Sequence, residues 1–250
     1  MSYFLKNNIK RKKIMKKLTN ALIAAIAIAS ISFTSAFAGM TMGVVGNIVD
    51  ASASGTETDR LTAAGANVAD TSSRTASVSE TGVAGSIYLE YTMSESRYPL
   101  VFGVEVTPGT VDISNKLSRT DTELSQTGNV HNTAISVKRS AEASATGLGT
   151  VYIEAPLFAG LYVKGGLARM TVNHANDSKM ATTSNISGTN YGAGWKTETA
   201  GGLTVKLSYE ETNYDTINLR STNNSVAANS SAITGEIDTK AYRFSIGKAF

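Results

Sequence analysis

Apolar and polar residues alternate with a period of two over several stretches of this chain. The clearest stretches cover residues 83–93, 100–107 and 151–155. Successive side chains of a β-strand point to opposite faces, so this spacing predicts strands with one apolar face and one mixed face. Both a water-soluble β-sandwich and a β-barrel show such alternation, and periodicity alone does not choose between them.

Short sequence blocks recur along the chain, and each lies in a strand–turn–strand unit. The block at residues 86–90 (SIYLE) is similar to that at 150–154 (TVYIE), and 160–164 (GLYVK) is similar to 202–206 (GLTVK). The predicted hairpins cover about 83–107, 148–172 and 189–214, and single strands are expected at about 40–49 and 239–250. Three hairpins and two strands make eight strands, and membrane-spanning barrels have an even number.

The connections between these units are of two kinds. Short turns join the strands within each hairpin, whereas long tracts rich in Ser, Thr, Asn, Ala and Gly separate the hairpins. The long tracts, predicted as extracellular loops, are about 50–82, 108–147, 173–188 and 215–236. This asymmetry is typical of an up-and-down barrel that spans a membrane. Small residues still alternate at 76–78 and 134–137, so the strands can continue outward as a protruding sheet, and extra wall at 130–140 would give ten strands.

The C-terminus carries the most specific pattern. Aromatic and apolar residues occupy alternate positions up to the final residue, namely Tyr242, Phe244, Ile246 and Phe250. This pattern resembles the last strand of bacterial outer-membrane β-barrel proteins of the small OmpA/OmpX-type eight-stranded class. The resemblance implies that these residues form a signal read by the barrel assembly machinery, and that the barrel is surrounded by outer-membrane lipid. Lys248 departs from the pattern, but a lysine near the membrane interface can extend its amine into water.

The predicted fold class is therefore all-β: an up-and-down antiparallel transmembrane β-barrel of eight strands. In lipid, a closed sheet is the only β structure that pairs every backbone group. A charge on the lipid-facing side costs about 2–4 kcal/mol at the midplane, and the predicted lipid-facing positions are almost free of charge. Arg169 interrupts this pattern, either because it marks the top of the lipid band or because a bulge lies near Gly165–Gly166.

The opposite faces of the same strands point into the barrel and carry both signs of charge. The predicted lumen residues are Glu90, Glu105, Glu154, Glu210, Lys164, Lys196, Lys206 and Arg243, with Tyr88, Tyr152 and Tyr162 between them. An eight-stranded barrel is just wide enough for side chains to fill. We therefore predict a paired, hydrogen-bonded network that fills the lumen; the alternative is a lumen whose charges are separately hydrated.

The first 38 residues have the pattern of a cleavable signal peptide. Basic residues at 6–17 precede an apolar stretch at 21–29, and Ala36, Phe37 and Ala38 form a small-x-small cleavage site before Gly39. An uncleaved anchor is the alternative, and Met15 is a candidate start of translation. Seven of the 23 basic residues lie in this segment, so the rest of the chain has 16 basic and 20 acidic residues and a net charge of about −4. This charge gives no reason to expect nucleic-acid binding.

Catalytic and cofactor-binding patterns are weak in this sequence. There is no cysteine, which excludes thiolate chemistry and disulfides. The two histidines, His131 and His174, fall in predicted loops, and residues 174–178 do not match the His-x-Ser spacing of outer-membrane deacylases. Asp112, Asp121 and Glu123 lack the spacing of a calcium loop. We predict no enzyme activity, no cofactor and no metal site.

The most informative remaining feature is the length of the polar tracts. They predict an outer-membrane protein with a structural or surface-interaction role, similar to adhesion, through an extracellular ligand that the sequence does not identify. The first alternative is a narrow, porin-like channel for ions or small solutes. The second is a soluble, secreted β-sandwich, which would be recovered without detergent.

Overall fold

A computed structural model describes residues 39–62, 69–93, 99–127, 130–176, 183–220 and 230–250, all of them in strands, turns or short connections. The strands are β1 (Met40–Thr62), β2 (Ala69–Thr92), β3 (Val101–Thr127), β4 (Val130–Pro156), β5 (Leu161–Asn176), β6 (Thr183–Glu198), β7 (Leu203–Tyr214), β8 (Ile217–Arg220) and β9 (Ser230–Ala249). None of the described residues belongs to a helix long and apolar enough to cross a membrane. The predicted signal peptide, with Ala36 and Ala38 of its cleavage site, lies outside the described residues.

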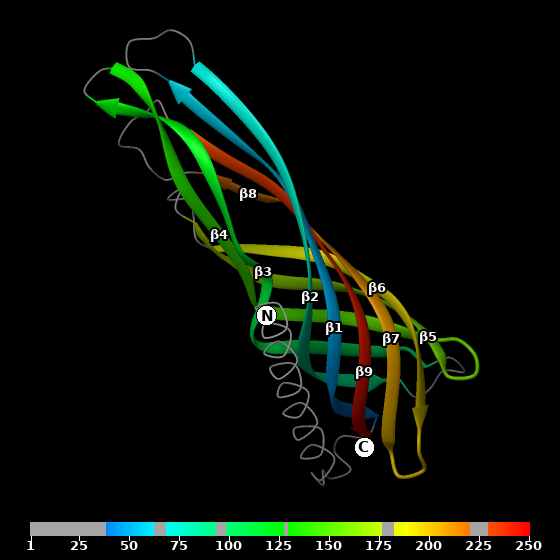
Figure 1. Cartoon of the computed structure of the whole chain (residues 1–250). Helices are drawn as coiled ribbons and strands as arrows, with labels where there is room; N and C mark the ends of the chain where they lie inside the picture. The colour runs from blue at the N-terminus through cyan, green and yellow to red at the C-terminus, as the bar shows by residue number, and fades with distance from the viewer. Residues whose placement is uncertain (1–38, 63–68, 94–98, 128–129, 177–182, 221–229) are drawn as a thin grey trace, which may run out of the picture.

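Eight of these strands form a closed antiparallel barrel. The strands follow the order β1-β2-β3-β4-β5-β6-β7-β9, and β9 pairs back onto β1, so that the end of the chain lies beside its first strand (Figure 1). The short β8 pairs with β9 beyond the end of β7. The alternative of ten strands required extra barrel wall at residues 130–140, but these residues belong to β4 and pair with β3. The predicted eight-stranded barrel is confirmed.

Backbone hydrogen bonds close the barrel at the end that carries the short turns, here called the short-turn end. The amide of Gly39 donates to the carbonyl of Phe250 and the amide of Phe250 donates to the carbonyl of Met40, both at 2.9 Å. The Lys248 ammonium donates to the Gly201 carbonyl in the neighbouring turn. The final residue is therefore bonded to the first strand, and Lys248 reaches a polar group at the rim rather than remaining in lipid.

The long tracts predicted as loops are largely strand. β1 continues to Thr62 and β2 begins at Ala69, and the two pair without a register shift along their whole length. The residues between strands at this end, 63–68, 128–129, 177–182 and 221–229, lie outside the described residues. The prediction of loop boundaries was wrong because tracts of Ser, Thr and Ala show no alternation of large apolar and polar side chains. Their backbone amides and carbonyls can nevertheless pair in a ladder, as those of any residue except proline can.

Beyond the barrel, the wall separates into two outer sheets. Pairing of β2 with β3 stops at Ile87 and Val106, and pairing of β6 with β7 stops at Gly188 and Tyr214. The first outer sheet then contains β8, β9, β1 and β2, and the second contains β3, β4, β5 and β6. Figure 1 shows the β1–β2 and β3–β4 hairpins extending furthest from the barrel at this long-strand end.

An apolar cluster fills the space where the two outer sheets leave the barrel. Its buried members come from both sheets: Ile113, Ala145, Met170, Val172, Ile186, Ile217, Leu219 and Ile237. Each aliphatic side chain buried in this way contributes about 1.5–3 kcal/mol. The sequence does not predict this cluster, because five of its residues fall in the tracts expected as loops, 108–147, 173–188 and 215–236. The available signal was the inward parity of β5, which continues from Lys164 through Ala168 to Met170 and Val172.

Candidate functional site

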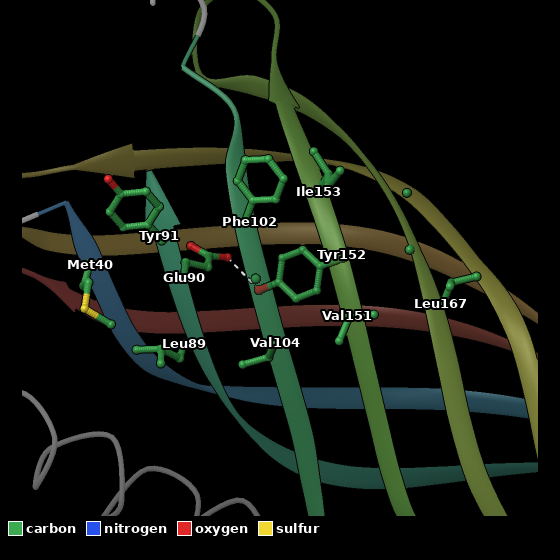
Figure 2. A pocket seen from close by; sticks show the side chains of 13 residues that line it. Met40, Leu89, Glu90, Tyr91, Phe102, Val104, Val151, Tyr152, Ile153 and Leu167 are labelled. Carbon is green, nitrogen blue, oxygen red and sulfur yellow. Dashed lines mark hydrogen bonds between the residues drawn. The ribbon is translucent and has the colours of Figure 1, made fainter. Parts of the chain in front are cut away.

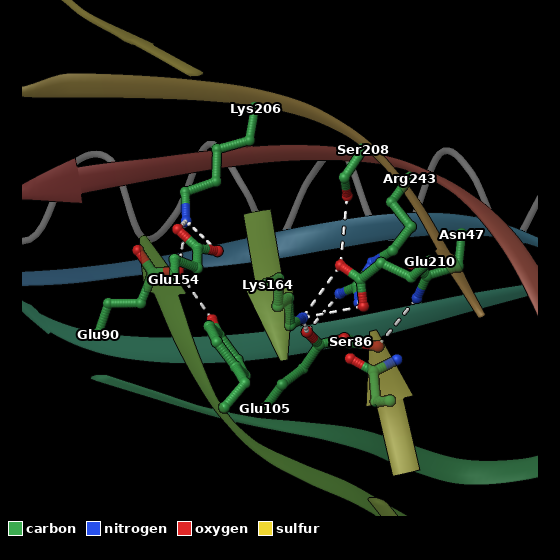
Figure 3. A network of polar contacts seen from close by, with 12 residues as sticks. Asn47, Ser86, Glu90, Glu105, Glu154, Lys164, Lys206, Ser208, Glu210 and Arg243 are labelled. Carbon is green, nitrogen blue, oxygen red and sulfur yellow. Dashed lines mark hydrogen bonds and ion pairs between the residues drawn. The ribbon is translucent and has the colours of Figure 1, made fainter. Parts of the chain in front are cut away.

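Charged side chains cross the lumen in the half of the barrel nearest the short-turn end. Alternation along each strand turns these side chains inward while their neighbours face lipid. The structure brings together seven of the eight predicted residues, all with nearly buried side chains: Glu90, Glu105, Glu154, Lys164, Lys206, Glu210 and Arg243. They form two groups, which Figure 3 shows side by side.

The first group places one cation between two carboxylates. Lys206 of β7 donates to Glu154 of β4 at 2.8 Å and also pairs with Glu90 of β2. The Tyr152 hydroxyl donates to Glu90 at 2.7 Å. Because β2, β4 and β7 are not neighbours in the wall, this group ties together distant parts of the barrel across its interior (Figure 3).

The second group lies next to the first and is balanced in charge. Arg243 of β9 pairs with both Glu105 of β3 and Glu210 of β7. Lys164 of β5 donates to Glu210 at 2.9 Å and lies 3.9 Å from Glu105. The Ser208 hydroxyl donates to Glu210 at 3.3 Å. Buried charges are tolerated when they are paired and hydrogen-bonded, as they are in this group.

Lys196, the eighth predicted residue, lies apart from both groups. It is half-buried on β6 near the short-turn end, directly opposite Lys206 in the strand register. Among the described residues, no carboxylate lies within ion-pairing distance of its ammonium. Alternation along β6 correctly predicts that Lys196 points inward. Whether it forms an ion pair also depends on its position along the barrel axis, which alternation does not predict.

Three tyrosines fill the lumen between the charges, and glycines make room for them. The Tyr88 ring lies over Gly43 and Gly247, Tyr152 lies over Gly103, and Tyr162 lies over Gly194. A Cβ atom at any of these glycines would overlap the tyrosine. The Lys164 ammonium also lies 3.8 Å from the centre of the Tyr152 ring, a favourable cation–π distance. Glycine in these strands therefore serves close packing of aromatic rings.

A neutral polar layer separates the charges from the apolar cluster. Asn47 donates to Ser86 at 3.0 Å, and the Ser86 and Thr107 hydroxyls lie 2.7 Å apart. On other strands, Asn190 donates to Thr212 at 2.9 Å. The lumen thus changes along its length from charged, to neutral polar, to apolar, and side chains occupy it at each level.

The outward-facing positions of the barrel strands are mostly apolar, and Arg169 on β5 is an exception. β5 pairs with β4 and β6 through Gly165 and Gly166 without a register shift, so the bulge considered there from sequence is absent. Alternation continues, and Arg169 is exposed two residues beyond Leu167. On the outward face of β6 and β7, the Tyr191 and Tyr209 hydroxyls donate to Glu211 at 2.9 and 2.6 Å.

A hollow of about 570 Å³ lies on the barrel wall over β1 to β5. Figure 2 shows its apolar lining, which includes Tyr91, Phe102, Val151 and Leu167. Gly165 contributes to the hollow, since it carries no side chain and a Cβ there would meet no atom within 4 Å. Its apolar lining suits hydrocarbon chains, as the rest of this wall does.

Most of the residues considered for catalysis or metal binding have side chains outside the part of the chain that the structure describes. The side chains of His131 and His174 lie outside the described residues, as do Asp121 and Glu123. Asp112 is exposed on β3. Within the described side chains, no three His, Asp or Glu residues gather closely enough to hold a metal ion.

A closed antiparallel sheet with an apolar exterior and a polar interior defines a transmembrane β-barrel. The family comparison identifies which kind. The profile of the outer membrane protein beta-barrel domain matches residues 21–250, and the chain belongs to this family. The protein is therefore located in the bacterial outer membrane. No curated protein sequence matches the chain.

Several solved structures resemble the chain at low identity. The attachment invasion locus protein Ail of Yersinia pestis is 10% identical, with 78% of this chain and 98% of that chain covered and a TM-score of 0.30. Neisserial surface protein A is 11% identical, with coverages of 82% and 97% and a TM-score of 0.35. The outer membrane protease OmpT of Escherichia coli is 9% identical, with coverages of 86% and 99% and a TM-score of 0.33.

Proposed function

We propose that this protein is a non-catalytic surface-interaction protein, whose barrel anchors two outer sheets that contact ligands outside the cell. The observation that carries the proposal is the continuation of strands far beyond the barrel. Pairs of β1 with β2 reach Thr62 and Ala69, and pairs of β3 with β4 reach Thr127 and Val130. A rigid sheet held above a membrane suits recognition of other molecules, because binding surfaces commonly sit on segments positioned by a stable scaffold.

The filled lumen supports this role over a porin-like one. Ion pairs bridge the barrel near the short-turn end, and the apolar cluster occupies the other end. An ion crossing the apolar cluster would lose its hydration without finding polar partners. The narrow-channel alternative therefore has less support, and conductance distinguishes the two.

Shortening the β3–β4 hairpin tests the surface role. Replacing residues 114–142 by an Asn-Gly turn removes the outer part of the hairpin and keeps Ile113 and Ala145 in the apolar cluster. We expect the variant to assemble, as judged by heat-modifiable migration on SDS gels. Bacteria that carry it should lose most of their binding to a panel of immobilised extracellular proteins and glycans.

A conductance measurement is the matched control for this experiment. Purified wild-type protein in planar bilayers is expected to give no large, stable single-channel currents. Stable currents, together with unchanged surface binding by the shortened variant, would contradict the surface role and favour the channel.

We further propose that Tyr242, Phe244, Ile246 and Phe250 are read by the barrel assembly machinery. Phe250→Ser keeps the backbone bonds to Gly39 and Met40 but removes the terminal aromatic ring. We expect less assembled barrel in cells, with unchanged refolding of purified protein into detergent. Equal losses in both assays would mean that Phe250 acts through packing alone.

A further inference from the structure

Pairing with β3 covers only the last few residues of β2. β2 pairs with β1 from Ala69 to Tyr91, but it pairs with β3 only from Ile87 to Thr92. Within the described part of the chain, no strand pairs with the other edge of residues 69–86. This edge borders the seam between the two outer sheets.

The backbone groups at this edge can be assigned residue by residue. The amide of Thr92 donates to Gly39 on the β1 side at 2.8 Å, and the amide of Met93 donates to Leu100 on the β3 side at 3.0 Å. Successive residues of a strand alternate in this direction, and β2 pairs with β1 without a register shift. The amides and carbonyls directed at the free edge therefore belong to Thr71, Ser73, Thr75, Ser77, Ser79 and Thr81.

The two edges that face each other across the seam differ in how they are protected. On β3, Pro108 and Gly109 lie at the first of four places where the ladder with β4 shifts register, and Gly109 has a positive φ. Proteins protect exposed edges with proline, lysine and bulges of this kind. Residues 69–86 of β2 contain neither proline nor lysine, and their ladder with β1 is regular.

The side chains along the β2 edge leave the backbone accessible. Ser73, Thr75, Ser77, Ser79 and Thr81 are exposed, small and uncharged. Arg74 and Glu80 lie on the opposite face of the strand, so no charged side chain projects from the residues whose backbone groups meet the edge.

We propose that this edge, formed by residues 71–81 of β2, binds an extended segment of another polypeptide by β-strand addition. An extended peptide backbone can pair with a regular row of free amides and carbonyls. The main-chain hydrogen bonds formed in this way supply affinity that depends little on the sequence of the bound peptide. A second copy of this chain in the same membrane has the same orientation, so its β2 would pair with this edge as a parallel strand. Parallel pairing is the less stable kind, which disfavours a second copy as the partner. The inference rests on the proposed surface-interaction function and names its partner class.

Proline substitution tests the edge without disturbing the barrel. In the triple variant Thr75→Pro, Ser77→Pro, Ser79→Pro, the lost amides face the free edge and the ladder with β1 keeps its donors. The matched control is Thr75→Ala, Ser77→Ala, Ser79→Ala, which keeps these amides. The probe is a phage library of random 16-residue peptides, selected on the folded full chain in lipid nanodiscs. Selected peptides should bind the wild type and the alanine variant similarly, and the proline variant at least about tenfold more weakly.

Amide exchange measured by NMR reports on the same edge directly. In dilute protein the amides of Thr75, Ser77 and Ser79 should exchange quickly, while those of Ala76 and Val78 exchange slowly; a bound peptide should protect the first set. In the peptide selection, the proposal is overturned if no peptide is selected or if the selected peptides bind the proline variant as well as the wild type. In the exchange measurement, it is overturned if these amides are protected without peptide. Protection that depends on protein concentration would also overturn it, because it would indicate pairing between copies of this chain. If the proline variant keeps surface binding that the shortened β3–β4 hairpin loses, the edge proposal fails while the surface function stands.

Discussion

Replacing Lys206 with methionine is expected to destabilise the barrel by about 3–5 kcal/mol, the usual cost of removing one partner from a buried ion pair. Lys206 is the cation that both Glu90 and Glu154 share in the first lumen group, and all three side chains are nearly buried. Without it, two carboxylates lie close together inside the barrel, and among the described side chains only the Tyr152 hydroxyl still donates a hydrogen bond to them. The measurement is the free energy of unfolding in urea, for protein refolded into lipid vesicles.

Two controls separate charge from packing in this experiment. Lys206→Met combined with Glu90→Gln and Glu154→Gln removes the unpaired charges and should recover most of the lost stability. Lys196→Met removes a half-buried lysine that, among the described residues, has no carboxylate within ion-pairing distance, and its effect should stay within about 1 kcal/mol. Equal effects of Lys206→Met and Lys196→Met would show that the lumen charges are separately hydrated and not a paired network.

The substitution Gly43→Ala is expected to cost about 1–3 kcal/mol or to prevent folding, because it overfills the lumen. A Cβ atom on Gly43 would overlap the Ile246 carbonyl oxygen, which belongs to the adjacent strand, and the Tyr88 ring. Backbone atoms in a closed barrel cannot move away without breaking the β1–β9 ladder. Urea unfolding of refolded protein, together with the fraction that shows heat-modifiable migration, measures the effect.

Gly46→Ala on the same strand is the matched control. A Cβ atom on Gly46 would meet nothing within 4 Å, since this position faces outward. Alanine restricts the unfolded chain more than glycine does, so a neutral or slightly stabilising effect of up to about 1 kcal/mol is expected. A similar loss of stability for both variants would contradict the assignment of Gly43 to the tightly packed interior.

The sequence by itself determined which face of each barrel strand meets lipid and which meets the lumen. Direction alternates from one residue to the next, so the inward positions of Glu90, Glu154 and Lys206 could be predicted without knowing which strands are neighbours. The aromatic C-terminus and the spacing of the hairpins likewise indicated an eight-stranded barrel in the outer membrane, and the family match supports this assignment.

Only the tertiary structure decided which of these residues meet. Pairing of Lys206 with Glu90 or of Arg243 with Glu105 joins strands far apart in sequence, and it depends on strand tilt and on height in the closed barrel. Among the described residues, the same geometry leaves Lys196 with no carboxylate within ion-pairing distance. It also gathers Met170, Ile186 and Ile217 into the apolar cluster and ends β2–β3 pairing at Ile87. Alternation is a local property of the backbone, whereas these contacts arise when distant strands close on one another, and no short stretch of sequence encodes that closure.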